Sequence, residues 1–296
     1  MASVQDLKRR VRSVKNTRKI TKAMELVASA RLRRAQTRIE AMRPYAETMR
    51  ELIAGVGRAS ASVRGLPLLQ QRDEVKTVAI VALTGDRGLA GPFNAQILRR
   101  AFALERELRG EGVAVRFVAI GKKGRGTFAF RGHEVAREFV GFTDRPAYSD
   151  AQAIAHRVAE LFTEREVDRV VLVYNTYVSA LTQRVTEQDV LPISADILET
   201  DEEERAADTL RGDFIFEPEP EEILERLLPV YLETQVYRAL LESAASEQGA
   251  RMTAMRNASK NAGELIDGLT LQMNRARQAE ITQEILEVVA GAEALS

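Results

Sequence analysis

Residues 4–56 read VQDLKRRVRSVKNTRKITKAMELVASARLRRAQTRIEAMRPYAETMRELIAGV, and the spacing of their apolar side chains decides the fold. Sixteen positions recur at a mean step of about 3.5 residues, the period of a coiled-coil seam. Fourteen of them are apolar. The seam consists of Val4, Leu7, Val11, Val14, Thr17, Thr21, Met24, Ala28, Leu32, Ala35, Ile39, Met42, Ala46, Met49, Ile53 and Val56. It predicts one helix from about Ser3, its cap, to about Ala59, with a bend at Pro44 unless the bend is absorbed locally.

A second seam of the same period lies near the other end of the chain. It consists of Leu241, Ala245, Gln248, Met252, Met255, Ser259, Ala262, Ile266, Leu269, Met273 and Ala276. The pattern predicts a last helix over about 221–295, and its phase slips over 274–280. Two narrow seams, about 180 residues apart, predict that the terminal helices pair as a long antiparallel two-helix coiled coil. The slip marks where the last helix leaves its shorter partner.

The middle of the chain alternates between strand and helix patterns. Apolar, β-branched runs predict strands, and a weaker alternation predicts a hairpin. The predicted strands are Thr77–Leu83, Val113–Ile120 and Val170–Tyr174, the helices Phe93–Arg109 and Ala151–Arg165, the hairpin Tyr177–Val190 and a loop Gly121–Gly126. Strands that alternate with helices indicate βαβ units and a mainly parallel sheet. The fold class is therefore α/β plus the coiled coil.

Four segments follow from these patterns. We predict an N-terminal coiled-coil helix over 1–59, a linker over 60–76, a central Rossmann-like α/β domain over 77–213 and a C-terminal coiled-coil helix over 214–296. Eleven of the sixteen aromatic residues fall between Phe93 and Tyr177, which favours a thick central core between thin terminal helices.

Composition argues against several kinds of site. The chain has no cysteine, which excludes disulfides and thiolate metal sites. Its two histidines, His133 and His156, have no carboxylates at ligand spacing, so we expect no metal site. No triad or paired-carboxylate pattern stands out, and we expect no catalytic or cofactor-binding residues. No run of about 18 apolar residues predicts a membrane span.

Two other functions stay open from the residues alone. The turn Gly85–Gly91 follows a strand and precedes a helix, as a phosphate-binding loop would, and Gly121–Gly126 could hold an anion. A nucleotide-using α/β enzyme is therefore one alternative. Between Lys8 and Arg38 there are twelve Lys or Arg and one acid, so a basic coiled-coil nucleic-acid binder is another.

The last fifteen residues include Ile285, Leu286, Val288, Val289 and several alanines. We expect this end of the helix to be apolar on nearly every side. Such a helix must be enclosed, and another protein has to enclose it because the first helix is too short to reach.

Three motifs together identify a resemblance. They are Ile20–Ala35 (ITKAMELVASARLRRA), Ser246–Met255 (SEQGARMTAM) and Arg277–Glu284 (RQAEITQE). The last motif opens a complete signature, Ile281-Thr282-x-Glu284-x-x-Glu287-x-x-x-Gly291-Ala292. In this combination the chain resembles the γ subunit of bacterial F-type ATP synthases over nearly its whole length. The turn 85–94 is similar to the family's segment but departs from it at Ala90 and Pro92.

The resemblance implies a non-catalytic rotor subunit of the central stalk. The coiled coil would stand inside a ring of three α and three β subunits, couple proton-driven rotation of the membrane c ring to ATP synthesis at the β subunits, and regulate ATPase activity and proton flow. The ε subunit would lie alongside. The chain would reach the cytoplasmic face of the bacterial cell membrane only through this complex, and would bind no nucleic acid.

The resemblance also assigns contact residues. Those that meet the β subunits would be Met24, Arg277, Gln278, Thr282 and Glu284. The apolar bearing at the tip would contain Val288, Val289, Gly291 and Ala292, and the contact with the c ring and ε would contain Phe214, Phe216 and Glu217.

Overall fold

The structure, a computed structural model, describes residues 3–58, 65–198 and 219–294. The chain divides into two compact units. One joins residues 1–29 to residues 251–296, and we call it the helix-pair unit; the other, residues 30–250, is the globular unit. Both long helices contribute to both units.

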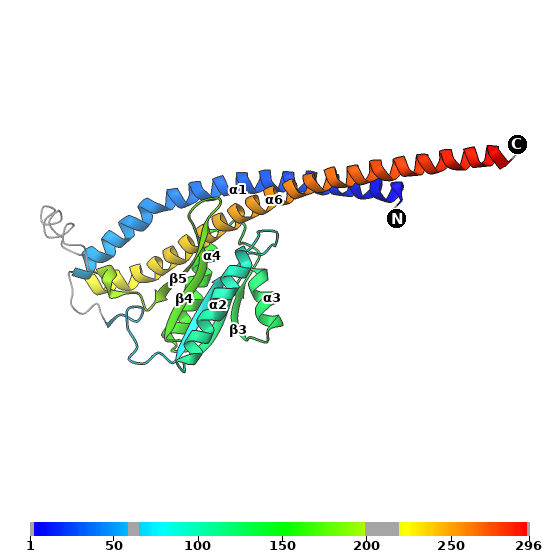
Figure 1. The fold of residues 1–296 in the computed structure, drawn as a ribbon. Coiled ribbons are helices and arrows are strands. Elements are labelled where there is room, and N and C mark those ends of the chain that lie inside the picture. The colour runs from blue at the N-terminus through cyan, green and yellow to red at the C-terminus, as the bar shows by residue number, and fades with distance from the viewer. Residues whose placement is uncertain (1–2, 59–64, 199–218, 295–296) are drawn as a thin grey trace. The chain divides into compact units, whose positions relative to one another are not determined.

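The predicted strands and helices occur in the predicted order, with one further helix and one further strand between Lys122 and Phe139, and Figure 1 shows all of them as a ribbon. They are α1 (Val4–Arg58), β1 (Thr77–Leu83), α2 (Phe93–Gly110), β2 (Ala114–Ile120), α3 (Lys122–Phe130), β3 (Val135–Phe139), α4 (Tyr148–Thr163), β4 (Arg169–Tyr177), β5 (Gln183–Leu191), a 3₁₀ helix (Ala195–Leu198) and α6 (Pro220–Ala294). The predicted segment boundaries at 59, 76 and 213 stay predictions.

A mainly parallel sheet lies at the centre of the globular unit. Its strand order is β3-β2-β1-β4-β5, in which the first four strands are parallel and β5 is antiparallel to β4. Side chains of β1 alternate between the two faces: Val78, Ile80 and Ala82 belong to the cluster with α2, and Ala79 and Val81 to the cluster with α4. Both faces of β1 are therefore buried, which explains its unbroken apolar run. The predicted Rossmann-like α/β fold is confirmed.

The two long helices also match the prediction. Ser3 caps α1, since its hydroxyl accepts a 3.2 Å hydrogen bond from the Asp6 amide. The helix continues through Pro44, as α6 does through Pro229. All sixteen seam positions of α1 are buried or half-buried except Thr17, whose hydroxyl bonds to the Ser13 carbonyl.

Within the helix-pair unit, α1 and α6 are antiparallel. Arg256 of α6 contacts Glu25, and Gly263, seven residues later, lies against Arg18, seven residues earlier in α1. The register is therefore constant over two turns. The seam of α6 is buried or half-buried down to Ala276, and from Arg277 to Ala290 the side chains are exposed. The predicted coiled coil and the predicted end of its seam are both confirmed.

Three local predictions need correction. The segment Gly121–Gly126 is no loop: Gly121 makes a turn at φ +86°, and α3 starts at Lys122. A glycine accepts this backbone conformation without strain. The strand β3 was not expected, because its sequence VAREF includes polar residues and has no continuous apolar run. In the structure its side chains are half-buried or exposed, which explains that composition. The segment Tyr177–Val190 is not a hairpin by itself: it contains most of β5, and the hairpin forms between β4 and β5.

Candidate functional site

The carboxyl ends of β1 and β4 lie where the strand order reverses. In open α/β sheets this switch point is where ligands bind. Here α6 occupies it: the Ser243 hydroxyl donates to the Leu83 carbonyl at 3.3 Å, and the Ser246 hydroxyl donates to the Asn175 carbonyl at 2.9 Å. Both serines are buried. The chain's own helix thus takes the place of a ligand.

Gly85 shows how closely the helix approaches. A Cβ built there would lie 2.7 Å from Oε1 of Glu247, a side chain that is itself buried. The Gly85 amide donates to Asn94 Oδ1 at 2.8 Å. The glycine that suggested a phosphate loop is needed for the close packing of α6 on the sheet, which removes the main argument for a nucleotide site.

The amino terminus of α3 is also satisfied from within. Asp86 Oδ1 accepts a hydrogen bond from the Lys122 amide at 3.1 Å, and Thr84 Oγ1 accepts one from the Gly124 amide at 2.8 Å. A helix amino terminus favours an anion, and here the anion is the carboxylate of Asp86. Within Gly121–Gly126, the amides of Lys122 and Gly124 that could have held an external anion therefore already bond to side chains of the same chain.

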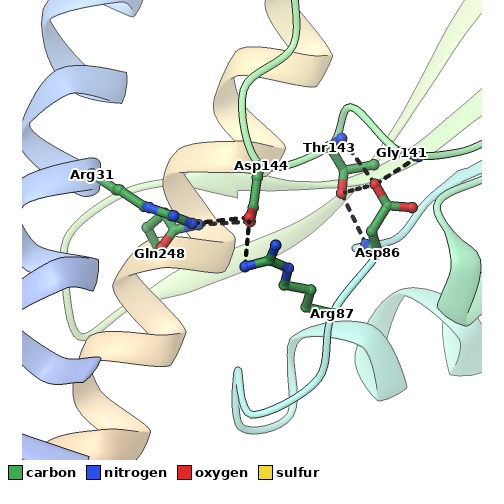
Figure 2. Close-up of polar contacts among 7 residues, drawn as sticks. All are labelled: Arg31, Asp86, Arg87, Gly141, Thr143, Asp144 and Gln248. Carbon is green, nitrogen blue, oxygen red and sulfur yellow. Dashed lines mark hydrogen bonds and ion pairs between the residues drawn. The ribbon is translucent and has the colours of Figure 1, made fainter. Parts of the chain in front are cut away.

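Asp86 also holds the connection between β3 and α4. Its Oδ2 accepts bonds from the Gly141 amide at 2.9 Å, the Thr143 amide at 3.2 Å and the Thr143 hydroxyl at 3.0 Å (Figure 2). Burial raises the pKa of Asp86, but the bonds from Gly141, Lys122 and Thr143 outweigh it, and the pKa is lowered overall. The carboxylate is ionised and fixed at neutral pH.

The neighbouring Asp144 contacts both long helices. Its Oδ2 lies 2.9 Å from Arg31 Nη1 of α1 and 3.5 Å from Arg87 Nη1 of the loop after β1. Its Oδ1 accepts a bond from Gln248 Nε2 of α6 at 3.2 Å. Figure 2 shows the carboxylate between these side chains.

Met24 lies in the helix-pair unit and is half-buried. The adjacent Glu25 is buried; it accepts bonds from Lys22 Nζ at 3.0 Å and from Arg256 Nε at 3.1 Å. These bonds, that of Lys22 first, lower the pKa of Glu25. Ile20, Leu26 and Val27 are exposed nearby in the sequence, so this part of α1 presents apolar side chains among its basic ones.

The carboxyl-terminal part of α6 exposes several large apolar side chains. The exposed fractions are 46% for Ile281, 57% for Ile285, 63% for Leu286, 73% for Val288 and 53% for Val289. Arg277, Gln278, Thr282 and Glu284 are exposed as well. Helical spacing places Glu280, Gln283, Glu284 and Glu287 on one face, so the expectation of an apolar surface on nearly every side was too strong. The segment is amphipathic, and its apolar face is broad.

The structure says less about the remaining predicted contact residues. Gly291 and Ala292 belong to α6. Phe214, Phe216 and Glu217 lie outside the described residues. Met24 and the exposed end of α6 belong to the same unit, the helix-pair unit. The sequence had predicted no contact between them.

Sequence reasoning missed Asp86, Thr143, Asp144 and the pair Glu25–Arg256. An aspartate in the turn after a buried strand was the available signal for Asp86, since aspartate in a turn often bonds to nearby backbone amides. Asp144 follows β3, which was itself not predicted, and no local pattern pointed to it.

Neither histidine takes part in a metal cluster. His133 Nδ1 lies 3.3 Å from Glu105, and His156 Nδ1 lies 3.0 Å from Glu160. Among the described residues, no three His, Cys, Asp or Glu side chains gather as metal ligands would. Over the same residues, no helix combines the length and apolar character that a membrane span needs.

Comparisons with known proteins agree with this architecture. The sequence model of the ATP synthase family matches residues 3–295. The ATP synthase gamma chain of Rubrobacter xylanophilus is 47% identical over all of this chain and 99% of its own length. That of Desulforamulus reducens is 48% identical over the full length of both.

Solved structures resemble the chain too. A chain in the central stalk and c-ring structure of Tetrahymena thermophila mitochondrial ATP synthase is 28% identical, with a TM-score of 0.60 over 81% of this chain and 99% of that one. A chain in a Euglena gracilis mitochondrial ATP synthase structure reaches a TM-score of 0.67 at 19% identity, over 99% and 94%, which shows the same fold. From its sequence and its fold, the chain belongs to the ATP synthase gamma-chain family.

Proposed function

We propose that the chain is the non-catalytic central-stalk rotor subunit of an F-type ATP synthase. It couples proton-driven rotation of the membrane c ring to ATP synthesis at the β subunits, and it regulates ATP hydrolysis and proton flow. The observation that carries the proposal is the end of α6, where every side chain from Arg277 to Ala290 is exposed although several are large and apolar. Such a surface suits a collar supplied by other subunits.

The contacts of this proposal follow from chemistry. The apolar side chains at the tip, Val288 and Val289 with Gly291 and Ala292, make non-directional contacts, which let one surface slide past another. Arg277, Gln278, Thr282 and Glu284 supply polar contacts below the tip, and Met24 lies in a basic stretch suited to an acidic element of β. Exposed ion pairs contribute only about 0–1 kcal/mol, so they can bias an angle and still break at every step.

Other partners complete the assembly. Phe214, Phe216 and Glu217 contact the c ring and ε. The chain reaches the cytoplasmic face of the bacterial cell membrane through this complex. Support comes from the Tetrahymena match, whose structure holds a central stalk together with a c ring. The catalytic residues belong to the β subunits, and the filled switch point of the sheet fits a chain that handles no nucleotide.

Direct observation of rotation tests the proposal. The chain has no cysteine, so Arg106→Cys, on the exposed side of α2, gives one attachment point for a bead. The purified, labelled chain is assembled with α and β subunits that are fixed to a surface, and ATP is added. We expect the bead to rotate in one direction in steps. A complex that hydrolyses ATP while the bead stays still would overturn the proposal.

A further inference from the structure

We propose that Asp144 is a positioning residue through which the α/β domain passes torque to both long helices. The inference rests on the proposed rotor function. It concerns only the globular unit, since Arg31, Arg87, Asp144 and Gln248 all belong to it.

One carboxylate of the globular unit contacts both long helices. Asp144 stands in the connection between β3 and α4, and its two oxygens reach different helices. Oδ2 contacts Arg31 of α1 at 2.9 Å, and Oδ1 contacts Gln248 of α6 at 3.2 Å. The side chain is 23% exposed and that of Arg31 is 35% exposed, so water screens the pair less than a surface pair. One side chain of the domain thereby links both helices.

The place of this link along the helices matters. Arg31 is the second residue of α1 within the globular unit, whose first is Ala30, and Gln248 lies two residues before its last, Ala250. The link therefore lies at the end of the globular unit, next to the residues where both helices continue into the helix-pair unit. Torque applied to the α/β domain would reach the helices at this position. Beyond this grip, only Ala30 of α1 and residues 249–250 of α6 remain within the globular unit to twist.

Directional bonds supply what apolar packing lacks here. The domain side of α6 also packs through Val236, Ala239 and Leu240, which are buried in the apolar cluster. Apolar contacts resist separation but distinguish poorly between neighbouring registers, whereas buried polar contacts can fix one register. Gln248 is almost fully buried and carries such a contact. The link thus favours one axial and one rotational position of the helices on the domain.

The carboxylate is supported from behind. The preceding residue, Thr143, bonds through its amide and hydroxyl to Asp86, which also accepts a bond from the Gly141 amide (Figure 2). Asp86 accepts a further bond from the Lys122 amide. These bonds tie the β3–α4 connection to the loop after β1 and to the start of α3. Arg87, from that same loop, contacts Asp144 directly. The support is therefore an interlocked set of loops at the ends of the strands.

The first experiment measures coupling in the complete ATP synthase reconstituted into vesicles. Asp144→Asn keeps the shape and removes the charge. The control is Asp189→Asn, which breaks the 2.5 Å ion pair with Arg169 between β4 and β5, neither of whose partners belongs to a helix. We expect the ATPase rate without a proton gradient to stay near wild type in both variants. We expect proton pumping per ATP hydrolysed to fall about threefold in Asp144→Asn only, and Asp144→Glu to restore part of it.

The second experiment reads the grip itself in the isolated full chain. Arg33→Cys on α1 and Arg137→Cys on β3 carry spin labels, both at exposed positions of the globular unit. Pulsed electron resonance should give one narrow distance distribution, which becomes broader or shifts when Asp144→Asn is added. Circular dichroism checks that the variant is folded, and Asp189→Asn should leave the distribution unchanged.

The outcomes separate the two proposals. An unchanged distance distribution in Asp144→Asn, or an equal loss of coupling in Asp189→Asn, would overturn the grip. Failure of the unaltered chain to restore any pumping would instead overturn the rotor function, and the distance measurement would still decide the grip.

Discussion

Glu25 of α1 and Arg256 of α6 are 231 positions apart in the chain, and their side chains form an ion pair in which Nε lies 3.1 Å from Oε1. Glu25 is buried and receives a second bond from Lys22. A buried carboxylate beside the seam, held between two cations, finds its cation on the opposite helix at one level only. The pair therefore selects the register in which the two helices meet.

Glu25→Gln tests this register lock. The substitution keeps the shape but leaves Lys22 and Arg256 without their anion, and we expect the free energy of unfolding to fall by about 1–2 kcal/mol. The control is Glu264→Gln in the same unit, because the pair of Glu264 with Lys260 is exposed and 3.9 Å long. Urea unfolding of the full chain, followed by circular dichroism, measures both. Equal stability of the two variants would contradict the lock.

Phe128 and Phe130 offer a matched pair in one helix. Phe128 is fully buried and stacks on Phe117 with a centroid distance of 4.4 Å, whereas Phe130 is 92% exposed. We expect Phe128→Ala to lower the free energy of unfolding by about 3–5 kcal/mol through the cavity it leaves. Phe130→Ala should change it by less than about 0.5 kcal/mol. Denaturation midpoints decide, and a large effect of Phe130→Ala would mean that α3 packs differently.

Gly85→Ala probes the close approach of α6 to the sheet. The new methyl group would stand 2.7 Å from Oε1 of Glu247, so either α6 or the loop has to move. We expect a loss of about 1–3 kcal/mol, typical of overpacking. Gly88→Ala in the same loop is the control, since its nearest neighbour there would be Lys123 Cε at 3.7 Å. If both variants melt like the wild type, Glu247 does not pack on the loop as described.

The pH dependence of stability should report on Asp86. Its pKa in the folded chain lies below the usual 3.8, because the bonds from Gly141, Lys122 and Thr143 outweigh the effect of burial. A lowered pKa stabilises the fold above about pH 3.8, and this contribution is lost as the pH falls through the folded-state value. Wild type should therefore exceed Asp86→Asn in stability at about pH 7, and the difference should shrink at about pH 3. Urea unfolding at both values measures it; a difference independent of pH would show that the charge of Asp86 has no role.

The parts of the fold that were predictable depend on local patterns. The spacing of the seam from Val4 to Val56 and the β-branched run Thr77–Leu83 each indicate the type of element by themselves. The predicted bounds of α1 and β1 therefore agree with the structure to within a few residues. The start of α3 was not predictable, because it depends on bonds to Asp86 and Thr84, which lie 36 and 40 residues before their partners. Asp144 was beyond reach for the same reason: its partners come from α1, α6 and a loop. Unlike the apolar seams, a single polar contact between distant segments leaves no period in the sequence.

Val288 gives a test of the proposed bearing. The side chain is 73% exposed, so Val288→Asp should change the stability of the isolated chain by less than about 0.5 kcal/mol. In the assembled complex the same change would bury a charge in an apolar collar and lose about 1 kcal/mol of valine burial, and we expect the chain to bind the α and β subunits at least about fivefold more weakly. Gln283→Asp adds the same charge on the face of α6 that already carries Glu280, Glu284 and Glu287. It should therefore weaken binding less than Val288→Asp does. Titration of the labelled chain with α and β subunits measures both affinities. If Gln283→Asp weakens binding as much as Val288→Asp, the α and β subunits do not bind the apolar face of α6 in preference to the acidic face. The proposed apolar bearing would then be wrong.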